Sequence, residues 1–147
     1  MVFSSANRES LKYSGSDSFS SVYKLHGDYR YDKIKNTSKE LQFLEESMHQ
    51  QIKKRLHGRG LVVVGYSGCD DSIMSVLEEH IDEPGFLKYG LIWMIPIGAN
   101  ISNRVSNLMK RACSVNESSC IVMIPGFDEL MYHCYKMRNS TTAQLLK

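Results

Sequence analysis

The fold is decided by residues 61–74, which read LVVVGYSGCDDSIM. The four bulky apolar residues at the start show no polar alternation, which is typical of a strand covered on both faces in a parallel sheet. Gly65 and Gly68 then allow backbone angles and close ligand approach that side chains would block. A helix is predicted to begin at Ser67 or Asp70, so N–H groups of its first turn would lie at the carboxyl end of the strand, where open α/β sheets bind ligands.

Strands and helices alternate on both sides of this stretch. Strands are predicted at 22–25, 91–95 and 120–124, and helices at about 38–56, 70–81, 102–112 and 127–134, the last of them short. We therefore predict an α/β fold, with a Rossmann-like parallel sheet of about four strands and helices on both faces. Apolar spacing predicts that two of the helices turn these residues toward the core: Ile73, Met74, Leu77, Ile81, Val105, Leu108, Met109 and Ala112.

Length and composition predict one domain, and they argue against a nucleic-acid-binding or membrane-spanning protein. The 147 residues carry a formal net charge of +2, with scattered Lys and Arg, so nothing points directly to a nucleic acid partner. No apolar run approaches the roughly 18 residues of a membrane span, and no signal peptide is evident, so a cytoplasmic protein is expected. We predict a flexible Ser-rich segment at 1–21, one domain at 22–138 and a frayed tail at 139–147.

The four cysteines are spaced too irregularly for a metal site. Cys69, Cys113, Cys120 and Cys134 form no C-x-x-C pair, so neither zinc nor a redox motif is predicted. Because free cysteine is usually buried, these thiols are expected to be reduced and mostly buried.

His26 is the candidate catalytic residue. It follows the predicted strand at 22–25 and precedes Gly27, so its imidazole is expected in the ligand crevice while the chain turns away. Several short motifs accompany it in the same order along the chain: Tyr23–Asp28, Lys35–Thr37 with Glu40–Gln42, Val64–Gly68 with Asp70, Ser72–Met74, Gly90–Trp93 and Gly126–Leu130.

From about Val22 to Tyr135, this series resembles the sirtuin-like domains of bacterial antiviral defence systems. The resemblance implies a Rossmann-like fold that binds NAD and, in many members, hydrolyses it to nicotinamide and ADP-ribose instead of deacetylating lysine. It places His26 at the catalytic histidine and the loop of Gly65, Tyr66, Ser67 and Gly68 at the nucleotide. A base near neutral pKa suits this chemistry, because it can deprotonate a ribose hydroxyl or orient water. Asp70 has two readings, as a ribose ligand or as a helix cap.

The chain departs from the family pattern in two places. Cys69 stands where the family usually has an arginine, which removes a cation that would pair with phosphate. The family's glycine-rich first half finds no match before Val22, so the resemblance covers the C-terminal half of such a domain. An incomplete sheet predicts self-association or a larger defence assembly.

Two alternatives to a hydrolase of NAD remain open. One is a non-catalytic module, left by truncation, that binds NAD or ADP-ribose or holds an assembly together. The other is a serine hydrolase, because Gly65–Gly68 is similar to a nucleophile elbow and Asp128 and His133 follow in the expected order. Cys69 replaces the glycine that the elbow requires, and one short helix cannot place Asp128 and His133 separately beside Ser67.

Overall fold

The computed structural model describes residues 2–4, 22–24 and 38–145, with side chains from Glu46 to Asn139 except that of residue 47. The chain divides into two compact units, Met1–Gln51 and Ile52–Lys147. In the first unit, β1 (Val2–Ser4) pairs in parallel with β2 (Val22–Lys24). Helix α2 (Ser38–Leu56) begins in the first unit and ends in the second.

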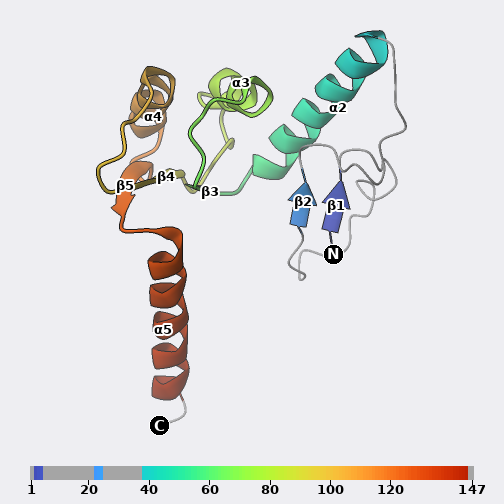
Figure 1. Cartoon of the computed structure of the whole chain (residues 1–147). Helices are drawn as coiled ribbons and strands as arrows, with labels where there is room; N and C mark the ends of the chain where they lie inside the picture. The colour runs from blue at the N-terminus through green and yellow to red at the C-terminus, as the bar shows by residue number, and fades with distance from the viewer. Residues whose placement is uncertain (1, 5–21, 25–37, 146–147) are drawn as a thin grey trace. The chain divides into compact units, whose positions relative to one another are not determined.

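The second unit contains the predicted alternation of strands and helices. Its sheet has the order β3-β4-β5, and all three strands are parallel. Figure 1 shows α3 and α4 side by side against the sheet, whereas α5 runs in another direction from the end of β5. The elements are β3 (Leu61–Val64), α3 (Asp71–His80), β4 (Leu91–Pro96), α4 (Asn103–Val115), β5 (Cys120–Ile124) and α5 (Phe127–Leu145).

The core lies between one face of the sheet and helices α3 and α4. Strand register aligns Val63 with Trp93, so these side chains lie on the same face, and Trp93 is fully buried there. The opposite face, with Val62 and Ile92, is exposed or half-buried. The helix spacing predicted the core well: of the residues named from it, only Ile73 is partly buried, and the fully buried Val76 was missed.

The α/β fold is therefore confirmed, but the sheet differs from the predicted one in strand number. It has three strands where about four were expected, because β2 pairs with β1 instead of joining β3. β1 lies in the stretch predicted to be flexible, whose composition gave no strand signal. A three-residue strand depends on its partner's hydrogen bonds, and sequence composition does not reveal such a partner.

Two further expectations are corrected. All four cysteines are free, as predicted, but all are exposed, because they lie in a loop, on the outer side of α4, on β5 and on α5. Helix α5 extends to Leu145 and is longer than predicted. No helix among the described residues is long and apolar enough to cross a membrane.

Candidate nucleotide-binding loop

The loop between β3 and α3 is built around two glycines with positive φ. Gly65 has φ +68° and Gly68 has φ +78°, a conformation that other residues adopt at a cost. Gly68 is buried, and a side chain there would collide with Val105 of α4, whereas a Cβ at Gly65 would meet open space. Gly68 therefore serves the packing of the loop on α4, and Gly65 is the glycine that leaves the loop open.

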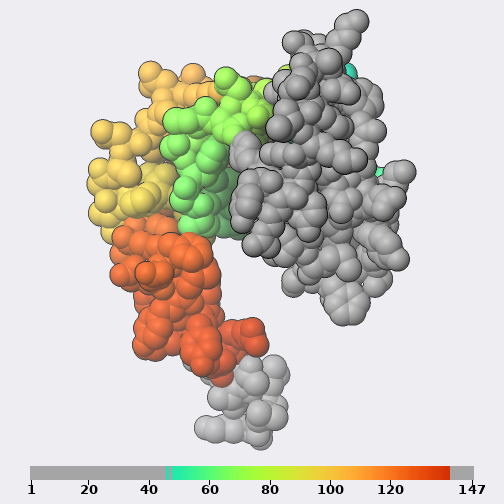
Figure 2. All heavy atoms as spheres, turned by 45° about the vertical axis from the view of Figure 1, so that its right-hand side comes forward, coloured from blue at the N-terminus to red at the C-terminus, as the bar shows by residue number. Residues whose placement is uncertain are grey.

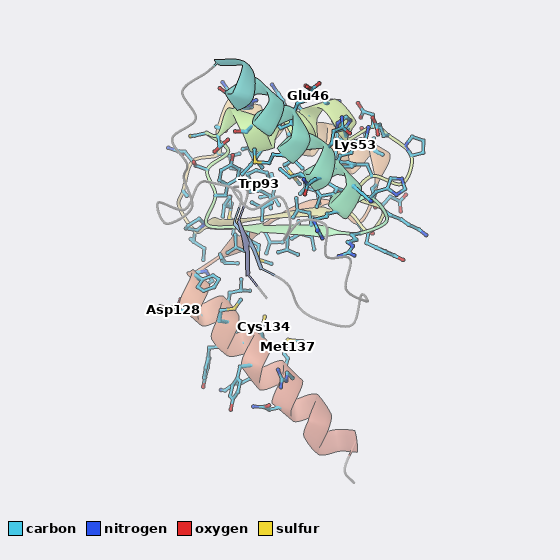
Figure 3. All side chains as sticks on the ribbon, turned by 90° about the vertical axis from the view of Figure 1, so that its right-hand side faces the viewer. Glu46, Lys53, Trp93, Asp128, Cys134 and Met137 are labelled. Carbon is cyan, nitrogen blue, oxygen red and sulfur yellow. The ribbon has the colours of Figure 1, made fainter. Side chains whose placement is uncertain are left out.

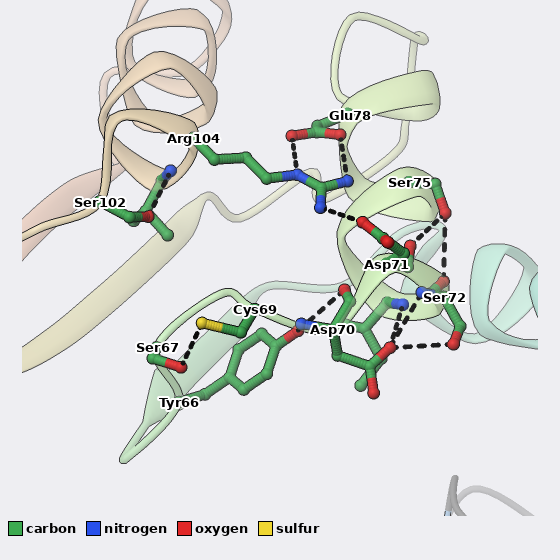
Figure 4. Close-up of polar contacts among 12 residues, drawn as sticks. Tyr66, Ser67, Cys69, Asp70, Asp71, Ser72, Ser75, Glu78, Ser102 and Arg104 are labelled. Atoms are coloured by element: carbon green, nitrogen blue, oxygen red, sulfur yellow. Dashed lines mark hydrogen bonds and ion pairs between the residues drawn. The ribbon is translucent and has the colours of Figure 1, made fainter.

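Tyr66 fixes the shape of the loop from within. Its hydroxyl accepts a hydrogen bond from the backbone N–H of Asp70 and donates to the carbonyl of Asp70, both at 3.1 Å (Figure 4). Its ring packs beside Trp93, with 5.8 Å between ring centroids. Burial raises the pKa of the Tyr66 hydroxyl, so the neutral form that makes both hydrogen bonds is favoured. Tyr66 thus acts as a brace within the loop.

Asp70 is the N-cap of α3. Its Oδ1 accepts hydrogen bonds from the Ser72 N–H and hydroxyl, both at 2.9 Å, and from the Ile73 N–H at 3.4 Å. Of the two roles predicted for Asp70, ribose ligand and helix cap, the structure thus shows the hydrogen bonds of the cap. It also corrects the expected role of the helix N-terminus, because these two N–H groups already bond a carboxylate and are not available to a ligand.

The backbone N–H groups that remain available come from the loop itself. No described residue accepts a hydrogen bond from the backbone N–H of Ser67, Gly68 or Cys69. Ser67 and Cys69 are exposed, and the Ser67 hydroxyl donates to Cys69 Sγ at 3.2 Å. Successive N–H groups in such a turn, with a hydroxyl beside them, form a surface suited to an anion such as phosphate.

Arg104 joins the helices behind the loop, and the sequence gave no signal of this. Its guanidinium donates to both carboxylate oxygens of Glu78, at 2.7 and 2.9 Å, and also pairs with Asp71 (Figure 4). These contacts tie the first turn of α4 to α3. The two partners are 26 and 33 residues away from Arg104 along the chain, so a local pattern could not reveal them.

The Glu78–Arg104 pair predicts a pH dependence of stability. The hydrogen bond from Arg104 lowers the pKa of Glu78, so the pair stabilises the fold above the unfolded pKa of about 4.5, and this contribution is lost as the pH falls through the lowered value. Glu78→Gln should lower the melting temperature at neutral pH and reduce the loss of stability between about pH 6 and about pH 3. Glu79→Gln, at an exposed neighbouring position, is the control. Equal acid sensitivity in Glu78→Gln and the unmodified chain would contradict the prediction.

The structure does not describe His26, which lies outside the described residues. The remaining predicted site residues, from Gly65 to Asp70, are contiguous in the loop. For the hydrolase alternative, Ser67 bonds Cys69 and no described histidine, while Asp128 and His133 are exposed on α5. The described contacts therefore give no support to a nucleophile elbow.

One hollow among the described residues of the second unit lies away from this loop. It measures about 350 Å³ and is lined by the segment Ile81–Lys88 and by the end of α4, on the side where β4 begins. Its carboxylates, Asp82 and Glu83, disfavour the binding of a phosphate. Asp82 is paired with Arg111, and Glu83 is paired with Lys53 and His80. Among the described residues, no three potential metal ligands lie together.

Comparison with known proteins identifies a family model that matches the chain. A family model described as a SIR2-like domain matches residues 4–112, which include the whole loop and His26. The match begins earlier than Val22, inside the segment 1–21 that was predicted to be flexible and outside the domain, and it ends before β5. No curated protein matches the chain significantly.

Proposed function

Because the chain belongs to the SIR2-like domain family, we propose that the loop after β3 binds NAD and that the domain hydrolyses it. The observation that carries the proposal is the set of loop N–H groups at Ser67, Gly68 and Cys69, for which no described residue is an acceptor, at the carboxyl end of a parallel strand. Bacterial antiviral defence is the proposed setting, and the cytoplasm, where NAD is abundant, is the proposed location. Self-association or a place in a larger defence assembly belongs to the same proposal.

The described residues fit a dinucleotide phosphate. The loop N–H groups point to no acceptor of the described chain, the Ser67 hydroxyl is exposed, and Gly65 adds no side chain to fill the space beside them. Tyr66 and Asp70 keep this surface in one shape, since the tyrosine bonds both backbone groups of the cap residue. In this proposal Gly65, Ser67 and Gly68 contact the ligand through the backbone, the Ser67 hydroxyl adds a contact of its own, and Tyr66 and Asp70 position the loop.

The proposed reaction breaks the bond between nicotinamide and ribose. Water adds its oxygen to the ribose C1′, the bonding electron pair leaves with nicotinamide, and one proton is released, giving nicotinamide and ADP-ribose. His26 is proposed to take up the proton, from a ribose hydroxyl or from the attacking water, because an imidazole is a base near neutral pH. Zinc has no part in this proposal.

A purified chain allows binding and cleavage to be measured separately. We expect NAD binding by calorimetry and nicotinamide release by chromatography, with release abolished in His26→Ala while binding persists. Ser67→Ala, which removes only an exposed hydroxyl, should weaken binding without unfolding the chain. Binding without release in the unmodified chain would favour the non-catalytic NAD or ADP-ribose module. Failure to bind NAD, in a chain shown by circular dichroism to be folded, would overturn the proposal.

Cys69 offers a test in the direction of stronger binding. It is exposed in the loop, where related domains usually carry an arginine, so Cys69→Arg adds a cation beside the N–H groups. We expect NAD to bind about tenfold more tightly, with the gain decreasing as salt is added. Cys69→Gln has similar length without charge and should change the affinity little. Equal affinities for the two variants would place the phosphates away from this loop.

A further inference from the structure

The hollow in the second unit lies at the opposite end of the strands from the candidate nucleotide-binding loop. Lys88 and Ser119, which line it, precede β4 and β5, whereas the loop follows β3, and the three strands are parallel. Helix α5 extends away from the rest of its unit (Figure 2), and none of its described residues lines the hollow. A molecule in this hollow would therefore not compete with a ligand of the loop.

The walls of the hollow are largely apolar. Two of the wall residues, Phe86 and Leu87, belong to the buried core, whereas Val115 is 51% exposed and marks the opening. An apolar cavity of about 150 Å³ holds one benzene ring. The hollow, at about 350 Å³, is more than twice as large and has room for a two-ring molecule. The apolar residues that line it are Ile81, Pro84, Phe86, Leu87, Ala112 and Val115.

Hydrogen bonds to two helices hold the wall around Leu87 in one shape. The side chain of Asn116, which ends α4, donates to the carbonyls of Leu87 and Lys88, at 3.3 and 2.9 Å. The N–H of Leu87 donates to the carbonyl of Leu56 in α2, at 3.3 Å. Leu87 has φ +46°, which costs free energy for a residue other than glycine, so these bonds stabilise a strained turn. A ligand would therefore enter a preformed site.

The carboxylates beside the hollow are already paired with cations. Asp82 pairs with Arg111. Oε1 of Glu83 pairs with Lys53 at 2.9 Å and with Nδ1 of His80 at 2.8 Å. Among the described residues that line the hollow, a cationic ligand would find no carboxylate without a cation, and an anionic ligand would be repelled by both carboxylates. Because a charged ligand would also lose hydration against the apolar walls, an uncharged ligand is favoured.

Ser119 is the polar side chain of the hollow that can bond such a ligand. It is 6% exposed, and its hydroxyl oxygen accepts a hydrogen bond from the N–H of Leu91 at 3.1 Å. No described residue accepts the proton of this hydroxyl, so Ser119 can donate to an oxygen of a ligand. Lys88 also lines the hollow, but its ammonium lies over the ring of Tyr89, 5.7 Å from the centroid, and Tyr89 is not a wall residue.

From the size, the apolar walls and the paired charges, we propose that this hollow binds an uncharged two-ring aromatic molecule whose carbonyl or hydroxyl oxygen accepts a hydrogen bond from Ser119. The apolar side chains cover the rings, and the single hydrogen bond sets their orientation. The site is separate from the loop after β3, and the proposal does not rest on NAD binding.

A series of small indoles tests the class of ligand. Oxindole is uncharged and carries a carbonyl oxygen, indole carboxylate is an anion, and aminomethylindole is a cation at neutral pH. We expect oxindole to bind the full chain with a dissociation constant of about 1 mM or below, and both charged compounds to bind at least about tenfold more weakly. Titrations followed by NMR measure the affinities. Absence of oxindole binding, or equal affinity for a charged compound, would overturn the proposal.

A substitution at the opening tests the location. Val115→Trp fills part of the hollow from an exposed position, so the chain should stay folded while oxindole binds at least about tenfold more weakly. Val62→Trp is the matched control, because Val62 is 52% exposed on β3 and does not line the hollow. Circular dichroism checks the fold of both variants. Equal affinities of the two variants for oxindole would place the ligand on another surface.

The loop variant Ser67→Ala separates this site from the candidate nucleotide-binding loop. It should bind oxindole as tightly as the unmodified chain does, whether or not the loop binds NAD, because the loop lies at the other end of the strands. Weaker oxindole binding in Ser67→Ala would place the ligand at the loop and contradict the proposal.

The hydrogen bond from Ser119 is tested by comparing two ligands. Indole has the same ring system as oxindole but no carbonyl oxygen. In Ser119→Ala, we expect the ratio of the two dissociation constants to shift about fivefold against oxindole. A loss caused only by disturbed packing would weaken both ligands equally and leave the ratio unchanged. An unchanged ratio would therefore exclude the proposed hydrogen bond.

Discussion

Gly68→Ala is expected to lower the free energy of unfolding by about 3 kcal/mol, from left-handed backbone strain and overpacking together. Gly68 has φ +78°, and a methyl group at its Cα would run into Val105 of α4. Val105 is itself buried, so it has little room to move. Urea denaturation followed by circular dichroism measures the loss.

Gly65→Ala is the matched control for this substitution. It introduces the same methyl group at nearly the same backbone angle, φ +68°, but into open space. Only the backbone strain remains, so we expect a loss of about 1 kcal/mol. Equal losses at the two glycines would mean that the contact with Val105 relaxes freely. The comparison also shows why Gly68 is a poor position for testing ligand binding, since a larger residue there disturbs the fold first.

Trp93→Ala is expected to cost about 4 kcal/mol, the usual loss for a large aromatic residue removed from a core. Trp93 is 1% exposed at the centre of the sheet and lies among the buried residues of α3 and α4 (Figure 3). The same denaturation experiment applies. Because Tyr66 packs beside it, we also expect the alanine variant to loosen the loop and weaken NAD binding at temperatures where the chain is still folded.

Trp93→Phe separates the effect on stability from the effect on NAD binding. It keeps an aromatic ring in the core and a surface for Tyr66, so the stability loss should be smaller and NAD affinity nearly unchanged. If Trp93→Phe weakened binding as much as Trp93→Ala did, the indole itself would be required by the loop. If neither variant lost stability, the placement of Trp93 in the buried core would be wrong.

The regular elements of the second unit were predictable from sequence because their signals are local. Asp70, one of the two predicted starts of its helix, is the N-cap in the structure, and Ser102, where the next helix was predicted to begin, is the N-cap of α4. The apolar run at residues 61–64 forms β3, and periodic apolar residues in α4, such as Leu108, are buried. Each of these features depends on neighbours within a few residues, which a pattern can show.

The contacts that were missed join distant parts of the chain. The collision that makes Gly68 necessary involves α4, and Arg104 reaches back to Glu78 and Asp71. Likewise, β2 has the residues of a strand, but its pairing with β1 was not visible in a Ser-rich segment. The cysteines were expected to be buried from an average tendency, yet the positions of their elements expose them. For the catalytic role of His26, the sequence remains the basis of the prediction.

The order of the strands has a consequence for hydrogen exchange. β4 lies between β3 and β5, so its amides bond on both sides, and opening them requires separating the sheet. β3 borders the described sheet and leads directly into the proposed nucleotide-binding loop. Its amides should therefore exchange through a smaller, local opening than those of β4. A ligand held by the loop would oppose this opening, so bound NAD should slow deuterium uptake in β3 and the first turn of α3 more than in β4.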